Sequence, residues 1–132
     1  MTSSRKGPGR KAEILHSRIV RSRLRCERCQ KRGVSITEFQ CAHIVRRWYA
    51  ATRCDENNAW CLCATCHYTV DNDPAELMEL VAATIGVQAY RALRETANAG
   101  PPAKGLTYWK AELARLEARC DELGLSKKWR AA

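Results

Sequence analysis

The chain has 132 residues, of which 45% are hydrophobic, 28% are charged and 8 are cysteines. This length suits one compact domain and excludes two full-sized ones. No apolar run approaches the roughly 18 residues that span a bilayer. The basic N-terminus is not followed by the apolar segment of a secretory signal, so we expect a cytoplasmic protein without membrane contact. In a reducing compartment, cysteines are more naturally metal ligands than disulfide partners.

The formal net charge of +9 comes from the first quarter of the chain. Residues 1–32 hold eleven Lys and Arg residues and two acidic ones, whereas residues 33–132 hold twelve of each sign. A segregated basic segment is typical of proteins that bind nucleic acid, because each neutralised phosphate releases condensed counterions. The alternative is a solvated tail that keeps the protein soluble. We favour a nucleic acid as the partner.

The N-terminal part is predicted to contain an arm and a helix. Residues 1–11 are rich in Ser, Gly, Pro and basic residues and predict a flexible basic arm. Residues 12–24 carry apolar residues at helical spacing and predict an amphipathic helix with His16 exposed to solvent. The outer face of this helix and the turn after it carry three candidate phosphate ligands: Arg18, Arg21 and Arg25.

The central part is predicted to be a hairpin followed by a helix. Residues 34–47 alternate and are rich in β-branched side chains, which favours a strand or hairpin arm. Residues 59–62 predict a second short strand, and residues 63–71 predict a helix that stops before Pro74.

Beyond Pro74 the composition changes to Ala, Leu, Glu and Arg. The stretch 75–98 contains Gly86 and predicts two short helices, while 107–123 predicts a longer helix with Gly124 as its C-cap. We therefore expect three regions. They are the arm at 1–11, a core with its N-terminal basic helix at 12–74, and a helical extension at 75–132 that braces the core or contacts a partner.

Two Cys-x-x-Cys pairs, Cys26/Cys29 and Cys63/Cys66, stand on either side of the predicted hairpin. Each pair forms a turn whose two sulfurs converge, and two such turns supply the four thiolates that structural Zn²⁺ prefers. A redox function for one pair is the weaker interpretation, because the chain shows no βαβ pattern. The remaining cysteines are expected to be packing thiols: Cys41, Cys54, Cys61 and Cys120.

Three polar residues next to the zinc turns suggest chemistry: His43, Asn58 and His67. A neutral imidazole can take a proton from water while a divalent cation stabilises negative charge on a phosphate, so their convergence would allow metal-assisted phosphodiester hydrolysis. His67 and Asp71 are four residues apart on a predicted helix and could share that cation. The alternative is that both histidines are additional zinc-site or core residues.

The sequence resembles the HNH (ββα-metal) endonucleases that carry a four-cysteine zinc site, over roughly residues 26–74. The resemblance rests on three stretches: Cys26-x-x-Cys29, Ala42-His43-Ile44-Val45, and Asn58-Ala-Trp-Cys-Leu-Cys63-x-x-Cys66-His67. The segment from His43 to Asn58 is similar to the phage branch of that family, which includes lambda-type recombination nucleases.

This resemblance implies an α+β fold, with a small zinc-stapled ββα-metal core and flanking helices, that cleaves DNA. It implies that His43 is the general base, that Asn58 holds the loop and orients His43, and that His67 binds a catalytic Mg²⁺, Mn²⁺ or other divalent cation. It also implies phage packaging or recombination proteins as partners. Two alternatives stay open: a non-catalytic zinc-stabilised nucleic-acid-binding module, and a structure-specific junction nuclease.

One position departs from the family pattern. Many members have an Asp metal ligand directly before the base histidine, whereas this chain has Ala42. Asp71 is the preferred substitute on helical geometry. Cys41 is the second choice, because a thiolate selects a softer metal.

The loop after His43 contains three candidate phosphate ligands, Arg46, Arg47 and Arg53, because guanidinium groups bind phosphates in bidentate fashion. Trp48 and Tyr49 lie beside them and either stack on nucleotides or pack on the core. With no base-reading element in the sequence, we expect recognition of the DNA backbone and shape.

Overall fold

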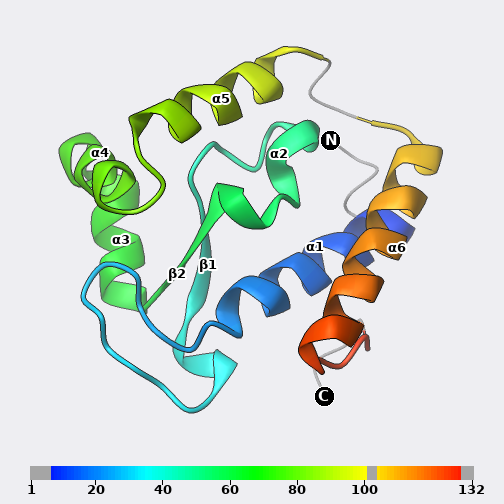
Figure 1. Ribbon diagram of the computed structural model, residues 1–132, viewed down its shortest axis with the longest axis horizontal. Helices are drawn as coiled ribbons and strands as arrows, with labels where there is room; N and C mark the ends of the chain where they lie inside the picture. Colours follow the sequence, from blue (N-terminus) through cyan, green and yellow to red (C-terminus); the bar gives the residue numbers. More distant parts are fainter. Residues whose placement is uncertain (1–6, 101–103, 129–132) are drawn as a thin grey trace.

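A computed structural model describes residues 7–100 and 104–128 of the chain (Figure 1). Within these ranges six α-helices surround a two-stranded antiparallel sheet, which confirms the α+β class. The elements, with η marking a 3₁₀ helix, are α1 (Gly7–Arg21), η2 (Ile36–Glu38), β1 (Gln40–His43), α2 (Ala50–Arg53), η3 (Glu56–Asn58), β2 (Ala59–Leu62), α3 (Ala64–Asn72), α4 (Pro74–Ala83), α5 (Val87–Asn98) and α6 (Leu106–Leu123).

The hairpin of β1 and β2 lies at the centre of the fold (Figure 1). Its register runs from Gln40 opposite Leu62 to His43 opposite Ala59. Because strand side chains alternate between faces, Gln40 and Ala42 share one face while Cys41 and His43 share the other. The outer edge of β1 pairs with no strand among the described residues.

The predicted strand at 34–47 is wrong outside Gln40–His43. Residues just before β1 form η2, which begins in a capping box: the Ser35 side chain accepts from the η2 backbone, and the Glu38 carboxylate accepts from the Ser35 backbone N–H. Such local side-chain bonds compete with strand pairing. The β-branched composition of the segment therefore does not produce a long strand.

Helix α1 packs against α6 and covers one side of the hairpin (Figure 1). It begins at Gly7, so the predicted arm at 1–11 is wrong for residues 7–11, and residues 1–6 lie outside the described ranges. Pro8 is compatible with this start, because proline is tolerated in the first helical turn. Leu15 and Ile19 of α1 pack against Trp109 and Leu116 of α6 in one buried cluster.

His16 is buried, with 1% of its surface exposed, so the predicted solvent-exposed histidine is wrong. It lies on the inner side of α1, and its Nε2 donates to the backbone carbonyl of Asp55 at 3.0 Å. This hydrogen bond offsets the cost of burying a polar ring.

Helices α3 and α4 cover the opposite face of the hairpin. Trp60 of β2 is buried there with Val70 and Val81, and its Nε1 donates to Thr84 Oγ1 at 2.9 Å. The predicted break in 75–98 is confirmed, because α4 and α5 are separated at Gly86, which has a φ of 87°.

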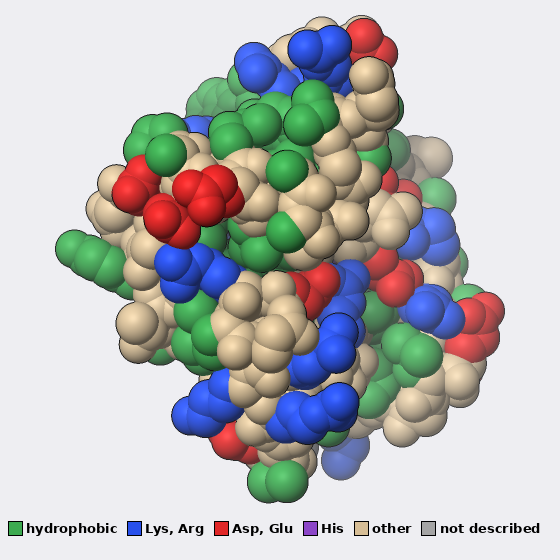
Figure 2. Space-filling model, turned by 60° about the vertical axis from the view of Figure 1, so that its left-hand side comes forward, with side chains coloured by type: hydrophobic (Ala, Val, Ile, Leu, Met, Phe, Trp, Pro, Cys, Tyr) green, Lys and Arg blue, Asp and Glu red, His purple; other side chains and the backbone are tan. Residues whose placement is uncertain are grey.

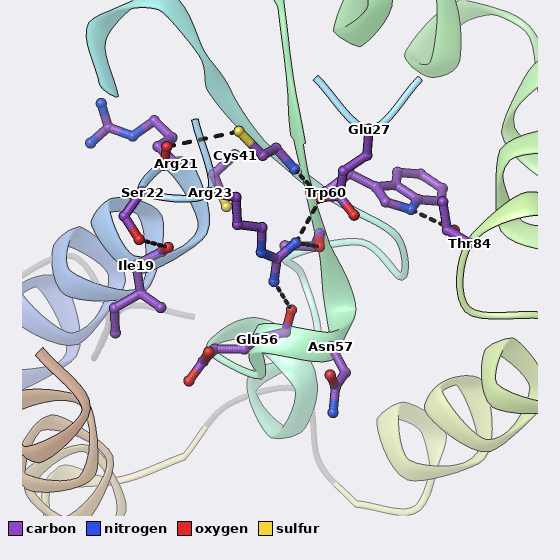
Figure 3. A network of polar contacts seen from close by, with 12 residues as sticks. Ile19, Arg21, Ser22, Arg23, Glu27, Cys41, Glu56, Asn57, Trp60 and Thr84 are labelled. Atoms are coloured by element: carbon purple, nitrogen blue, oxygen red, sulfur yellow. Dashed lines mark hydrogen bonds and ion pairs between the residues drawn. The ribbon is translucent and has the colours of Figure 1, made fainter. Parts of the chain in front are cut away.

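The end of α1 is tied to the hairpin by a polar network centred on Arg23 (Figure 3). The Arg23 guanidinium donates to the carbonyls of Ala59 and Glu56 and to the carboxylate of Glu27, at 2.8–2.9 Å. Glu27 in turn accepts from the backbone N–H of Cys61 at 2.7 Å. These bonds fix the Cys26/Cys29 turn relative to β2. No helix in the described ranges combines the length and apolar character that a bilayer span requires.

Candidate functional site

The two Cys-x-x-Cys turns meet at one point, as the sequence predicted. The Sγ atoms of Cys26, Cys29, Cys63 and Cys66 all lie within 4.8 Å of one another, and those of Cys29 and Cys63 are 3.9 Å apart. A tetrahedral zinc with Zn–S bonds of about 2.3 Å needs sulfurs about 3.8 Å apart. The cluster is therefore compatible with structural zinc.

The backbone around Cys26 favours its thiolate, whereas burial raises the pKa of Cys66 to about 12. Burial opposes ionisation of Cys26, but hydrogen bonds from the backbone of Cys29, Cys63 and Arg28 outweigh it and lower the Cys26 pKa to about 7. The Arg28 guanidinium donates to Cys66 Sγ at 3.4 Å and to the Glu76 carboxylate at 2.9 Å. Sequence reasoning missed this contact of Arg28, because Glu76 lies 48 residues away in the chain.

His43 is the last residue of β1 and is held by a backbone carbonyl. Its Nε2 lies 2.9 Å from the carbonyl oxygen of Arg53. A carbonyl can only accept, so the proton lies on Nε2 and Nδ1 carries the lone pair. Within the described ranges no residue forms a hydrogen bond to this Nδ1. Burial, followed by the neighbouring His16, lowers the His43 pKa to about 4, which keeps the ring neutral near pH 7.

Asn58 is fully buried and fastens the loop between the strands. Its Oδ1 accepts from the backbone N–H of Val45 at 2.7 Å, and its Nδ2 donates to the carbonyls of Val45 and Thr52 at 2.9 and 3.0 Å. The hydrogen bond that orients His43 is accepted by the backbone carbonyl of Arg53, which belongs to the same loop. Asn58 therefore acts on His43 through the loop.

His67 and Asp71 face one another on α3. His67 Nε2 lies 3.1 Å from Asp71 Oδ2, and His67 Nδ1 lies 2.6 Å from Gln40 Oε1. The i, i+4 spacing thus brings together the pair that sequence analysis proposed for a cation. Gln40 accepts a hydrogen bond from the other ring nitrogen and orients His67, a contact that the sequence did not indicate because it depends on how α3 packs on β1. Ala42 is buried and contributes no ligand atom.

The expected meeting of the two imidazoles differs from the observed arrangement. His67 contacts Gln40 on the α3 side of the hairpin, whereas His43 lies on the other face and groups with His16 and Cys41 within 4.8 Å. The cause is the two-residue period of the strand: positions 40 and 43 point to opposite faces. A ligand that touches both histidines must therefore cross the free edge of β1.

The arginines of the loop have unequal roles. Arg46 is exposed, and Arg47 is exposed while pairing with Glu13 at 2.6 Å. Arg53 is 3% exposed, and it donates to the backbone carbonyls of Arg47 and Trp48. The predicted phosphate contact of Arg53 is therefore wrong, because its guanidinium is buried and donates to backbone carbonyls of the loop.

The arginines near α1 also differ. Arg18 donates to the carbonyls of Ser126 and Lys128 at 2.7 and 2.6 Å, which joins α1 to the segment after α6. Arg21 donates to Ser17 at 3.0 Å, and Arg25 is exposed. Of the three arginines, only Arg25 has a side chain that forms no hydrogen bond or ion pair with a described residue.

Positive side chains gather on the lower part of the face in Figure 2. The exposed cations of the segment that follows α1 include Arg25, Lys31 and Arg32, close in sequence to the Cys26/Cys29 turn. A phosphate backbone would be attracted to this surface.

No protein-family model matches this chain, and neither do the curated proteins or the solved structures with which it was compared.

Proposed function

We propose that this protein is a zinc-stabilised, metal-dependent endonuclease that hydrolyses phosphodiester bonds in DNA, with His43 as the general base. The observation that carries the proposal is the orientation of His43. Its Nε2–H is fixed on the Arg53 carbonyl, and its Nδ1 lone pair has no hydrogen-bond partner in the described part of the chain. A ring held in one tautomer with an open lone pair can accept a proton from water.

The surroundings of His43 support a phosphate as the reacting group. Arg46 and Arg47 follow His43 three and four residues later and are exposed. The proposed reaction transfers a water proton to His43 Nδ1 while the water oxygen attacks phosphorus and the bond to the leaving oxygen breaks. Buried Asn58 and the Arg53 carbonyl maintain the position of the ring during that transfer.

His67 and Asp71 could share a divalent cation, because His67 Nε2 and Asp71 Oδ2 lie 3.1 Å apart, while Gln40 Oε1 holds the other ring nitrogen and orients the imidazole. When bound, such a cation supplies charge stabilisation to the phosphate and the leaving oxygen. His43 and His67 lie on opposite faces, so we place the scissile phosphate across the free edge of β1. At that edge a phosphate could contact side chains from both faces of the hairpin.

The test is cleavage of supercoiled plasmid, with Mg²⁺ or Mn²⁺, by protein that carries one equivalent of Zn²⁺. We expect nicked or linear product from the wild type and none from His43→Ala. The matched control is Tyr68→Ala, because Tyr68 is 72% exposed on α3 beside His67 and has no part in the proposed chemistry. Cleavage that persists in His43→Ala would contradict the assignment.

A second candidate is a non-catalytic zinc-stabilised module that binds nucleic acid. Two observations favour it: Ala42 offers no metal ligand, and His43 and His67 lie on opposite faces of the hairpin. Salt-dependent DNA binding without cleavage under any divalent cation would select this candidate. A third arm, comparing a four-way junction with linear duplex, tests for a structure-specific nuclease.

A further inference from the structure

Three metal-ligating side chains outside the four-cysteine cluster converge between α1 and β1. His16 comes from α1, and Cys41 and His43 come from the same face of β1. One donor atom from each lies within 4.8 Å of the other two. Cys41 Sγ is 3.9 Å from His16 Nδ1, and the two imidazole centroids are 5.4 Å apart.

Both rings are oriented in the way that metal-bound histidines usually are. His16 Nε2 donates to the carbonyl of Asp55 at 3.0 Å, and His43 Nε2 donates to that of Arg53 at 2.9 Å. A ligating histidine almost always donates its other ring N–H to a carbonyl, carboxylate or water. Each ring therefore presents the lone pair of Nδ1.

The distances require only a small contraction for a metal to bind. Zn–N bonds of about 2.0 Å and Zn–S bonds of about 2.3 Å in a tetrahedral shell imply donor separations of roughly 3.3–3.6 Å. The observed 3.9 Å exceeds those values by about 0.3–0.6 Å, and the 4.8 Å bound exceeds them by at most about 1.5 Å. Side-chain torsions on the two elements can supply that change.

We propose that His16, Cys41 and His43 form a second metal site, which takes a borderline or soft divalent cation such as Zn²⁺ or Co²⁺ and leaves one position to water. The donor set selects the metal, because imidazole and thiolate suit zinc and cobalt whereas Mg²⁺ requires oxygen ligands. Three protein ligands with an open fourth position differ from the closed four-cysteine site.

The charged groups around the site act on this cation in both directions. As the sulfur–metal bond forms, the Cys41 thiol proton passes to solvent, so one thiolate joins the dication. Arg21, Arg23 and Arg47 act on Cys41 from nearby and disfavour the dication, while Glu13 acts on His43 in the opposite sense. Cys41 and His43 are half-buried, which gives water and the metal a route to the site.

One consequence rests on the proposed function. The Nδ1 of His43 either takes a proton from water or binds the cation, and it cannot do both at once. A second equivalent of Zn²⁺ is therefore expected to suppress DNA cleavage. The binding measurements below do not use cleavage, so the metal site and the nuclease assignment can fail separately.

The first test is zinc stoichiometry after equilibration with Zn²⁺ and removal of loosely bound metal. We expect two zinc ions per chain for wild type, one for Cys41→Ala, and two for the control Cys120→Ala, which removes a buried thiol outside both clusters. One ion in the wild type, or two in Cys41→Ala, would overturn the proposal.

The second test needs no variant and so does not depend on how Cys41→Ala folds. In the wild-type protein loaded with two equivalents of Co²⁺, the imidazole N–H protons of His16 and His43 should give two solvent-exchangeable, hyperfine-shifted proton resonances. The four-cysteine site has no imidazole ligand and cannot produce them. Their absence would rule out coordination by these two rings.

Discussion

Replacing Asn58 with alanine tests whether one buried amide holds the loop that carries His43 and Arg53. Asn58 is fully buried and makes three hydrogen bonds of 2.7–3.0 Å, two with Val45 and one with Thr52. The substitution leaves three buried backbone groups without these partners, and each such loss costs about 1–3 kcal/mol. Such losses are not additive, so we expect the free energy of unfolding to fall by about 3–5 kcal/mol, at the large end for a single substitution.

The assay is urea denaturation of the zinc-loaded protein, with Asn57→Ala as the matched control. Asn57 is the exposed neighbour, and its side chain forms no hydrogen bond with the described residues. We expect the control to change the unfolding free energy by less than about 0.5 kcal/mol. A loss below about 1 kcal/mol for Asn58→Ala would refute the reasoning, because three buried groups left without hydrogen bonds should destabilise the fold by more than that.

Three further predictions address the zinc, the histidines and the arginines. Chelation of the zinc should abolish cooperative thermal unfolding followed by circular dichroism, because structural zinc contributes folding free energy directly; a cooperative transition at unchanged temperature would contradict this. Burial lowers the His16 pKa to about 4, so between that value and about 6.5 the unfolded chain binds the extra proton and stability falls as pH falls. His16→Gln should therefore reduce the loss of stability between pH 7.5 and 5.5 by about 1 kcal/mol in urea titrations, and an unchanged pH dependence would contradict the buried neutral ring. Arg47→Ala should lower the slope of log affinity for DNA against log salt by about 1 with little change in stability. Arg53→Ala should instead destabilise the fold by about 2 kcal/mol or more. A larger loss of stability in Arg47→Ala than in Arg53→Ala would contradict these roles.

The four-cysteine cluster could be predicted from sequence because its geometry is local. Each Cys-x-x-Cys turn places two sulfurs together whatever the rest of the chain does, and only the pairing of the two turns depends on the fold. The break at Gly86 and the C-cap at Gly124 were predictable for the same reason, since both depend on a glycine with positive φ, 87° and 69° respectively.

The arrangement of the histidines could not be predicted in the same way. His16 lies between basic residues in the sequence, but its side of α1 faces the hairpin, so packing decides its burial. The face of His43 depends on where β1 begins and ends, because a shift of one residue exchanges the two faces of a strand. The predicted strand at 34–47 was too long to fix the register of β1. The sequence therefore did not show which face of the hairpin carries Cys41 and His43, or that this face meets His16.

The most direct measurement is the crystal structure of zinc-loaded His43→Ala with a DNA duplex and Mn²⁺. The substitution is chosen because it should prevent cleavage and keep the DNA intact. Anomalous scattering should place Mn²⁺ at His67 and Asp71, with a phosphate at the free edge of β1 between that ion and position 43. Mn²⁺ bound away from α3, or DNA that contacts only the surface after α1, would contradict the nuclease account and leave the binding module.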